Sequence, residues 1–560
     1  MEGTIYDPVF NECEIEILRK FVSDPDPAHN VYALLPSLAG LAGALFARYS
    51  RAAGGARVTL LKEFVDENGE INRKKLDGLI ERVLIASGDE AVGEQEKAHL
   101  ACENVSNLAT KEMEDCRIDV SPIEQSSRYL VYDQRDRNGR FRYLRPKEVI
   151  DAGLLPQYEK VMDFVFQTYI DIIPDMAAFY MNMKPKSEAG YAVISDDPKK
   201  YKLAELADPN HVKAWGTTYK ADINTKTCDT LRGLLPAATL TNVGFAGGGR
   251  GFQNMLTKLM SHSLKEMQQL GYDAKQALSA VIPRYVQRAA PNQYLMNVRE
   301  AMKEFAKNSE KEIRSWNLRP FSTKEPSVEL FFYGDWEWDS FLIAHILYPY
   351  TQFSMARLYL YAQGLGIQKK EDIISLYCQN KEARGNRRNK PGRALEFGYP
   401  ITFDLMGDFG IYRDLQRHRM LTQQRQLLTP YLGEPEINPD IIEVGFKKEI
   451  KECIKRSRKL YDLLLTSCGA EVAQYAVLYM FNVRWYIGMN HREAFHLMEL
   501  RTIPQGHPNY RRLVQEMHRE LLKRDQSVAP LMEFVDYNEY KWNRADSEAA
   551  QRRKESKLKG

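Results

Sequence analysis

The two halves of the chain repeat the same short patterns, and this restricts the folds open to it more than any other feature. Ala47-Arg48-Tyr49 is echoed by Ala356-Arg357-Leu358, and Glu96 is paralleled by Glu396. The paired arginines are 309 positions apart and the paired glutamates are 300 positions apart. Similarity at a fixed long spacing is the mark of an internal repeat. The two halves are therefore expected to share a fold.

Length supports the same division, because 560 residues exceed what one hydrophobic core usually holds. We expect a first domain at 1–315 and a second at 325–542, with Pro320 and Pro326 interrupting the segment between them. The first domain is longer, and we expect inserted loops at about residues 133–147 and 184–224. Residues 543–560 form a charged tail without an apolar face.

Composition excludes several classes of protein. A net charge of +3 on 560 residues argues against dedicated nucleic-acid binding. The seven cysteines are scattered without a C-x-x-C pair, which predicts reduced thiols in a cytoplasmic protein and no zinc ribbon. The longest apolar run, Val31–Ala47, is slightly short for a membrane span and contains Pro36. We expect a buried helix there and no membrane association.

Hydrophobic periodicity predicts an α+β chain with helix in excess. Strands are expected where β-branched and aromatic residues cluster, at 129–132, 141–144, 328–333 and 401–405. Amphipathic or apolar helical patterns cover 74–86, 98–114, 158–183, 253–270, 272–289 (interrupted at Pro283), 339–363, 370–378, 411–426, 446–466, 492–500 and 509–522.

A polar stretch in the first half, Ser121–Tyr129, suggests an anion clamp. Glu124, Ser126, Ser127 and Arg128 offer one acceptor, two hydroxyls and one guanidinium fork within five positions. Hydroxyls, backbone N–H groups and an arginine together suit a phosphate or carboxylate. A helix-capping loop with a surface ion pair explains the same residues equally well.

In the second half, Arg417-His418-Arg419 places two permanent cations around a histidine, with aliphatic residues close by. Each guanidinium offers a planar fork for an anion. Taken alone, such a triplet is usually a solvated helical turn with salt bridges. The first half of the chain provides the reason to treat it differently.

The two stretches together resemble the flavin-dependent thymidylate synthases, the ThyX family, whose motif is R-H-R-x-x-S-x-N-E-x-S-x-R-Y. The first half has Cys116-Arg117-Ile118 in place of Arg-His-Arg and Ile123 in place of Asn, but it keeps the rest of the motif: Ser121, Glu124, Ser126, Arg128 and Tyr129. The second half keeps Arg417-His418-Arg419, has Thr422 for the first Ser, and has lost the later positions of the motif. Each half thus keeps the part that the other half lost.

The family's second signature shows the same division. The second half has Asn490-His491-Arg492 followed by Arg501, at the family spacing of N-x-R and a later Arg. The first half has Arg250 and then Leu259, without that later Arg. The family also has an Arg four residues before a Pro, and here the first half matches with Arg232, whereas the second half has Gln474.

The resemblance implies two diverged ThyX-like α/β domains in tandem, the first retaining the nucleotide-phosphate loop and the second retaining the flavin and pyrimidine side. It implies reductive methylation of dUMP to dTMP with FAD as cofactor and with NADPH and methylenetetrahydrofolate as co-substrates. Family members are tetramers with shared sites, so it also implies a homodimer with composite sites.

By the same resemblance, individual residues take expected roles. Arg501 and Arg417 would polarise the pyrimidine as catalytic groups. The cofactor would be bound by Arg417, His418, Arg419, Asn490 and Arg492. The uracil nucleotide would be bound by Glu124, Ser126, Ser127, Arg128, Arg232 and Asp414.

Several features depart from the family or remain open. Asp414 stands where the family has Gln, and an aspartate accepts but cannot donate a hydrogen bond to a ring carbonyl. Gly247–Gly251 lacks dinucleotide-binding spacing and is interpreted as a loop. His491, His496 and His507 are interpreted as core or flavin-contacting residues, so no metal site is expected. The alternatives are the same chemistry on another pyrimidine nucleotide, or a non-catalytic flavin- or nucleotide-binding protein.

Overall fold

The computed structural model comprises two compact units. Unit 1 comprises residues 1–103, 112–124 and 242–293, and unit 2 comprises 104–111, 125–241 and 294–560. The structure describes residues 2–3, 8–39, 41–49, 55–66, 68–72, 91–194, 197–315, 327–332, 337–384, 392–396, 401–525 and 529–542. Within these ranges, no helix combines the length and the apolar character required to cross a bilayer.

The centre of unit 2 is a sheet in the order β10-β11-β9-β8. Its strands are β8 (Ser327–Phe332), β9 (Ile401–Asp408), β10 (Thr422–Arg425) and β11 (Asn482–Met489), all paired antiparallel with their neighbours. Every residue of β11 is buried, and so is every residue of β9 except Asp408. Burial on both faces explains why β9 and β11 read as nearly continuous apolar runs.

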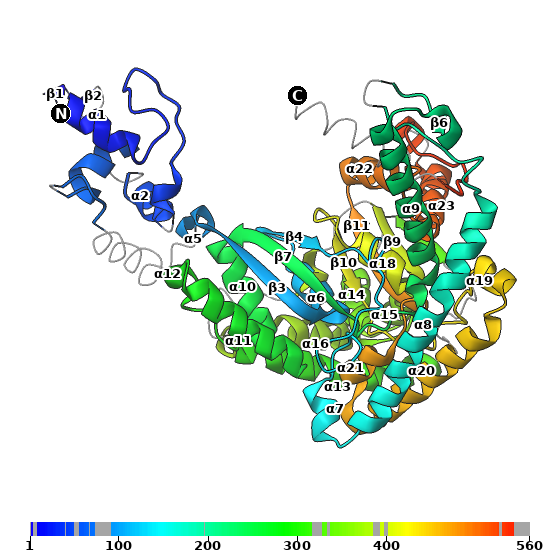
Figure 1. Ribbon diagram of the computed structural model, residues 1–560. Coiled ribbons are helices and arrows are strands. Elements are labelled where there is room, and N and C mark those ends of the chain that lie inside the picture. Colours follow the sequence, from blue (N-terminus) through cyan, green and yellow to red (C-terminus); the bar gives the residue numbers. More distant parts are fainter. Residues whose placement is uncertain are drawn as a thin grey trace. The chain divides into compact units, whose positions relative to one another are not determined.

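Unit 1 holds most of a second sheet, in the order β3-β7-β4. Its strands are β3 (Lys97–Ser106), β4 (Val120–Glu124) and β7 (Leu240–Gly248), and the division between the units falls within β3 and β7. The two sheets follow one plan. β3 leads into helix α6 (Asn107–Glu114) as β9 leads into α18 (Phe409–Leu415), and β7 leads into α10 (Gly249–Met260) as β11 leads into α22 (His491–Thr502) (Figure 1).

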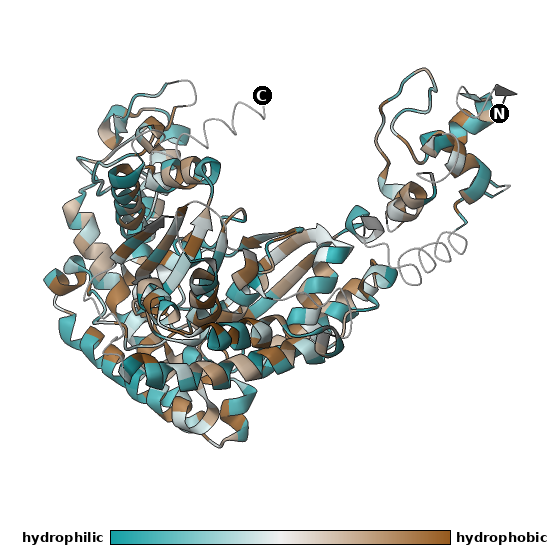
Figure 2. Cartoon of the chain, turned by 180° about the vertical axis from the view of Figure 1, so that it is seen from behind, coloured by the Kyte–Doolittle hydropathy of each residue, from teal (hydrophilic) through white to brown (hydrophobic). Residues whose placement is uncertain are grey.

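Long helices supply most of the remaining structure of unit 2. Helix α8 (Leu155–Met183) packs on α9 (Pro209–Leu231) and α20 (Lys447–Cys468), while α23 (Pro508–Arg524) packs on α22 and β8. Figure 2 shows hydrophilic and hydrophobic residues side by side on the long helices, and the buried residues of α20 recur at helical spacing, as in an amphipathic helix. Polar caps define where two of them begin, because Asp208 accepts a backbone N–H at the start of α9 and His507 does so at the start of α23.

Two equivalent segments pair backbone to backbone inside unit 2. The N–H of Ala237 donates to the carbonyl of Val477, and the N–H of Tyr479 donates to the carbonyl of Leu235. A short 3-10 helix precedes each segment, one beginning at Arg232 and the other at Gln474. The sequence alignment of Arg232 with Gln474 therefore matches the secondary structure. This pairing joins stretches from the two halves of the sequence directly.

A cluster of helices with its own apolar core packs against the central sheet of unit 2, where Tyr486 of β11 joins that core. It contains α13 (Gln293–Ser315), α14 (Trp338–Leu347), α15 (Met355–Gln363) and α16 (Ile367–Cys378). A buried ion pair lies beneath it, with Arg484 Nη1 3.2 Å from Asp404 Oδ2. The same carboxylate accepts the N–H of Met355 and the hydroxyl of Tyr348, so both oxygens of the buried aspartate are hydrogen-bonded.

The shorter elements complete the chain. In unit 1 they are β1 (Glu2–Gly3), β2 (Pro8–Val9), α1 (Glu12–Arg19), α2 (Ala42–Tyr49), α3 (Ala56–Thr59), α5 (Ala91–Gln95), α11 (Lys265–Ser279) and α12 (Pro283–Val286). In unit 2 they are α7 (Lys147–Asp151), β5 (Gly190–Tyr191), β6 (Tyr201–Lys202), α17 (Lys381–Arg384), α19 (Pro439–Val444) and α21 (Ala470–Ala473).

The expected elements have mixed outcomes. The long helix at 158–183 and the strands at 328–333 and 401–405 are confirmed as α8, β8 and β9. The helix expected at 98–114 is wrong in its first half, where residues 97–106 form β3. The helix expected at 411–426 ends at Leu415, and its last residues form β10.

Other expectations also need correction. Residues 129–132 and 141–144 form no strand, only isolated bridges from Phe141 and Tyr143. The run Val31–Ala47 is split between a short 3-10 helix (Pro36–Leu38) and α2. The division into units also differs from the expected boundary between 315 and 325, because segments from both halves pack into unit 2. The expected helix at 74–86 and the tail at 543–560 lie outside the described residues.

Candidate functional site

Arg128 is held by a carboxylate in the interior of unit 2. Its Nε and Nη2 donate to the two oxygens of Asp229, each at 2.6 Å. Both side chains are nearly buried, at 10% and 13% exposed. Asp229 lies in the last turn of α9, and Arg128 follows the loop that leaves β4. A planar fork meeting a carboxylate in this way is the strongest arrangement an arginine makes.

Arg232 forms a second pair three residues beyond Asp229. Its Nη1 lies 3.1 Å from Asp414 Oδ2 on α18. Its Nη2 is buried and has no hydrogen-bond partner in the part of the chain that the structure describes. Gly410 makes room for the guanidinium, because a Cβ there would lie 3.1 Å from that nitrogen. A buried donor without an acceptor is costly, so Arg232 Nη2 is suited to receive an anionic or carbonyl oxygen.

His507 lies between these two pairs as a neutral group. Its Nδ1 accepts the N–H of Asn509 at 3.2 Å, which leaves the proton on Nε2, 3.4 Å from the carbonyl of Asp229. Burial lowers the pKa of His507 well below its ordinary value, and the nearby Arg232 lowers it further.

The arginines determine the charge state of the carboxylates. Burial alone would raise the pKa of Asp229, but the charge and hydrogen bonds of Arg128 lower it to about 2. Burial is likewise outweighed at Asp414, whose pKa falls well below the usual range because of Arg232, Arg128 and then Arg417. Both aspartates are therefore ionised at neutral pH.

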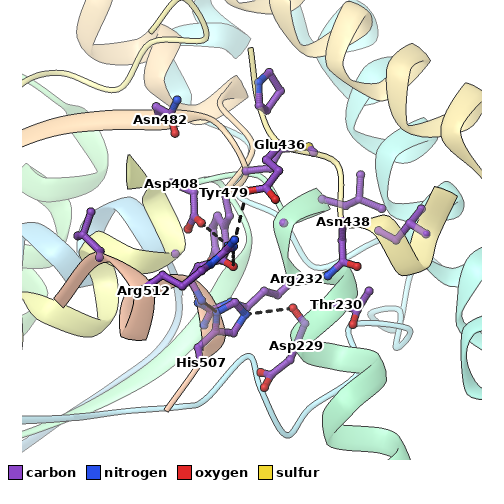
Figure 3. Close-up of a pocket in the computed structure, with 18 of the residues that line it drawn as sticks. Asp229, Thr230, Arg232, Asp408, Glu436, Asn438, Tyr479, Asn482, His507 and Arg512 are labelled. Carbon is purple, nitrogen blue, oxygen red and sulfur yellow. Dashed lines mark hydrogen bonds and ion pairs between the residues drawn. The ribbon is translucent and has the colours of Figure 1, made fainter. Parts of the chain in front are cut away.

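A cavity of about 590 Å³ opens on Arg232 and His507, the size of many small-molecule sites. Figure 3 shows Arg232, His507 and Arg512 side by side, with Asp229 and Asp408 close to them (Figure 3). Other lining residues are Thr230, Gly410, Glu434, Glu436, Asn438, Tyr479, Asn482, Asn509 and Glu516. Asp408 is half-buried, and burial of its carboxyl group raises its pKa although the carboxylate accepts hydrogen bonds from Asn509 and the N–H of Ile411.

The remaining expected nucleotide ligands have partners of their own. Ser127 accepts from Arg413 Nη1 at 3.4 Å, and Ser126 accepts the backbone N–H of Arg128 at 3.3 Å. Glu124 is buried at the end of β4 and belongs to unit 1, whereas Ser126, Ser127 and Arg128 belong to unit 2.

A second cluster lies where the turn after α18 meets α22. His418 Nδ1 is 2.8 Å from Glu493 Oε1, and Arg501 Nε is 2.8 Å from His418 Nε2. An arginine donates and never accepts, so Nε2 carries no proton and Nδ1–H donates to Glu493. His418 is thus neutral with its proton on Nδ1. Burial lowers its pKa, Glu493 opposes this, and Arg501 adds to it.

His418, Glu493 and His496 have ligand atoms within 4.8 Å of one another, which is close enough for the three side chains to bind one metal ion. Both ring nitrogens of His418 are already hydrogen-bonded, however, and one of them faces the cation of Arg501. The hydrogen bonds of the cluster thus account for the arrangement without a metal ion.

The other expected flavin ligands surround this cluster. Arg417, Arg419 and Arg492 are exposed. Asn490 caps α22, its side chain accepting the N–H of Glu493 at 3.0 Å. His418 and Asn490 are therefore held by hydrogen bonds within the chain, while the three arginines extend into solvent near the start of a helix, where positive potential favours anions.

The two clusters adjoin through Asp414 and Tyr510. Arg417 is near enough to Asp414 to lower its pKa, and Arg501 lies over the ring of Tyr510, 5.8 Å from its centre. Residues from both halves of the sequence thus meet in one region of unit 2. It presents guanidinium nitrogens, which suit an anion or a polarised carbonyl. Sequence reasoning missed Asp229, Glu493 and Tyr510, for which no motif exists. It interpreted His507 as a core or flavin-contacting residue, whereas the structure places His507 beside Arg232 in the lining of the cavity.

Comparison with known proteins agrees with this description. A family model described as thymidylate synthase complementing protein matches residues 44–284 and 374–525. A UPF0159 protein of Chlamydia muridarum is 35% identical over 557 residues, covering 96% of this chain and 98% of the relative. A UPF0159 protein of Chlamydia pneumoniae is 35% identical over 539 residues, covering 93% and 94%.

A more distant relative extends the range of organisms. A UPF0159 protein of Thermoplasma acidophilum is 27% identical over 512 residues, which is 90% of this chain and 97% of the relative. The family match spans more than half of the chain and includes Arg128, Arg232, Arg417 and Arg501. The protein is a member of the thymidylate synthase complementing protein family.

Proposed function

We propose that this protein is a flavin-dependent enzyme of the thymidylate synthase type, which methylates a uracil nucleotide at C5 (dUMP to dTMP). Methylenetetrahydrofolate would supply the carbon and NADPH the reducing equivalents. The observation that supports this most is the meeting of Arg128 and Arg232 from the first half with Asp414 and Arg501 from the second. Each half keeps only the part of the family motif that the other lost.

We also propose that the chain arose by tandem duplication. The matching strand orders support this, as do the 3-10 helices that begin at Arg232 and at Gln474. In the second half, Gln474 Oε1 accepts from Arg425 Nη1 at 2.9 Å and from the N–H of Leu428 at 3.0 Å. The chain itself therefore supplies hydrogen-bond partners for Gln474, whereas Nη2 of Arg232 has none among the described residues. One site per chain, and two chains in a dimer, follow from the proposal.

The residues available suit the FAD that the family implies. The exposed guanidinium groups of Arg417, Arg419 and Arg492 near the start of α22 offer positive charge to a diphosphate. His418 and Asn490 support that surface from within, since their hydrogen-bonding groups are occupied by Glu493 and Arg501. Bound FAD would supply the redox chemistry.

The chain's own residues would bind and polarise the substrate. The open Nη2 of Arg232 would take a phosphate oxygen within the cavity. The terminal nitrogens of Arg501 have no hydrogen-bond partner among the described residues, because His418 engages only Nε. They could donate to a ring carbonyl and stabilise negative charge that develops on the ring while C5 is being methylated, which stabilises the transition state more than the ground state.

The direct test is tritium release from 5-labelled dUMP, which should require FAD, NADPH and methylenetetrahydrofolate. Arg501→Ala should lower kcat by about 100-fold, the effect of removing one fixed donor from developing charge. Arg232→Ala should act mainly on KM for the nucleotide. Arg137→Ala, at an exposed loop arginine, is the matched control and should change neither constant. Absence of release with every uracil nucleotide would contradict the proposal.

A second function is favoured by one observation. Arg128 and Arg232 are each paired with a buried carboxylate of the chain, so both cations expected to bind phosphate are already neutralised. A non-catalytic flavin- or nucleotide-binding protein would tolerate this arrangement. FAD absorbance of the purified protein combined with nucleotide binding but no tritium release would identify this alternative.

A further inference from the structure

The side chains of Glu493, His418 and Arg501 form a hydrogen-bonded chain that connects the two ends of α22 through His418. Glu493 lies in the first turn of this helix and Arg501 in its last turn, and both reach the imidazole of His418 from the turn after α18. Long helical side chains point back toward the N-terminus, which brings the guanidinium of Arg501 over the preceding turns and toward His418.

We propose that Glu493 is a positioning residue: by accepting the Nδ1–H of His418, it holds the Nε2 lone pair toward Arg501 and so orients the guanidinium whose terminal nitrogens face the substrate. No motif of the sequence includes Glu493. The proposal rests on the proposed function only for the substrate; the geometry of the three side chains is independent of it.

The directions of the two hydrogen bonds leave only one proton arrangement. Arg501 has no lone pair to accept with, so a proton on Nε2 would oppose its N–H. With the proton on Nδ1, an acceptor is needed on that side, and Glu493 is the acceptor at 2.8 Å. The His418 and Glu493 side chains are only 2% and 8% exposed, so water cannot easily replace either partner.

The surroundings support a neutral imidazole held between opposite charges. The titratable or charged side chains facing His418 are Glu493, Arg501 and His496, whose ring centre is 5.2 Å away. The carboxylate of Glu493 favours the imidazolium, and the guanidinium of Arg501 disfavours it. Protonation would release Arg501 from Nε2, so the orientation of Arg501 should be lost in acid.

The first test is histidine nitrogen NMR on the full-length protein with ¹⁵N-labelled histidine, the His418 signals being assigned with His418→Gln. The wild-type signals should be those of the Nδ1–H form. Glu493→Gln keeps an acceptor oxygen and should retain this form while lowering the titration midpoint of His418. Arg501→Met removes the cation and should raise that midpoint. Glu493→Ala should yield a mixture of tautomers.

The control is Glu520→Gln, at a half-buried carboxylate paired with the exposed Lys523 on α23, which should leave every His418 signal in place. The proposal is overturned if the wild-type ring carries its proton on Nε2, or if Glu493→Gln and Arg501→Met shift the midpoint in the same direction. Glu493→Gln is the more informative variant if Glu493→Ala fails to fold.

The second test measures kinetics with dUMP. Glu493→Ala should lower kcat about tenfold through loss of orientation, Glu493→Gln should restore most of the rate, and the acid limb of the pH profile should follow the NMR midpoint of His418. Unchanged kcat with altered tautomers would overturn the positioning role. If no variant and no wild-type protein turns over dUMP, the proposed function fails, and the effect of Glu493→Ala on the binding constant for dUMP decides the positioning role instead.

Discussion

At the scale of residues, the site is defined by the carboxylates that hold its arginines. Asp229 engages the fork of Arg128 completely, whereas Asp414 leaves Nη2 of Arg232 open. The two arginines are therefore not equivalent. Arg128 is anchored, and displacing Asp229 from it would leave a buried charge unpaired, at a cost of several kcal/mol. Arg232 keeps one buried donor nitrogen that its pair with Asp414 does not use.

The Asp229 pair should make stability depend on pH. The pKa of Asp229 in the folded protein is lowered to about 2 from its ordinary value of 3.8. The contribution of the ionised carboxylate to the free energy of unfolding is therefore present above pH 3.8 and is lost as the pH falls toward 2. Asp229→Asn should be less stable than wild type at pH 7, and this difference should shrink by about 2 kcal/mol on acidification. Urea unfolding at a series of pH values measures it.

The control is Asp171→Asn, at an exposed carboxylate on α8 that accepts from Gln167. The difference in unfolding free energy between this variant and wild type should be small at every pH. A pH-independent difference for Asp229→Asn would mean that the aspartate is not held ionised by Arg128.

At the scale of elements, helix ends determine where the site residues lie. Asp408 caps α18, which carries Arg413 and Asp414, and His507 caps α23 beside Asn509. Capping residues therefore serve both the helix and the cavity. Helix α19, whose Ile441 lines the cavity, ends at a glycine in the left-handed conformation. This residue, Gly445, has φ of 102°, and its N–H donates to the carbonyls of Ile441 and Ile442.

Gly445→Ala should destabilise the protein by about 1 kcal/mol, because a Cβ is strained in this conformation. A Cβ would meet no atom within 4 Å, so the cost arises from the backbone alone. Gly216→Ala, in the interior of α9, is the matched control, since its Cβ would also meet open space but its backbone is not left-handed. That variant should lose no stability, because alanine is favoured over glycine inside a helix by about 0.5–1 kcal/mol. Equal losses of stability in thermal unfolding would refute the explanation.

At the scale of the whole molecule, the two halves of the sequence are not two independent folding units. Leu235–Ala237 pairs with Val477–Tyr479, and Arg232 pairs with Asp414, all inside unit 2. A cut between the halves would leave backbone groups and buried charges without partners in both fragments.

Fragments 1–315 and 325–560 should therefore fail to unfold cooperatively when produced alone, and should recover a cooperative transition and co-purify when produced together. Circular dichroism during heating, with size-exclusion chromatography, tests this. Cleavage of the intact protein within 316–324 after folding is the control and should leave the transition in place. A cooperative transition in fragment 325–560 alone would show that the halves fold separately.

Much of the fold could be predicted from local pattern, and the failures have identifiable causes. The amphipathic run of α8 and the β-branched and aromatic clusters of β8 and β9 each carry their own signal. Ala98, Leu100 and Cys102 alternate as a strand should, but their helix-forming character hid β3. Thr422–Arg425 has no strand signal and becomes β10 only because β11 lies beside it.

By itself, the sequence determined the residue types of the site: the arginines at 128, 232, 417 and 501 and the histidine at 418 follow from motif remnants with family spacing. Only the tertiary structure decided what each of them does, because charge is local in space rather than in sequence. Asp229, Asp414 and Glu493 select which guanidinium nitrogens are occupied and which remain open. Such pairings over long separations depend on packing, which no local pattern encodes.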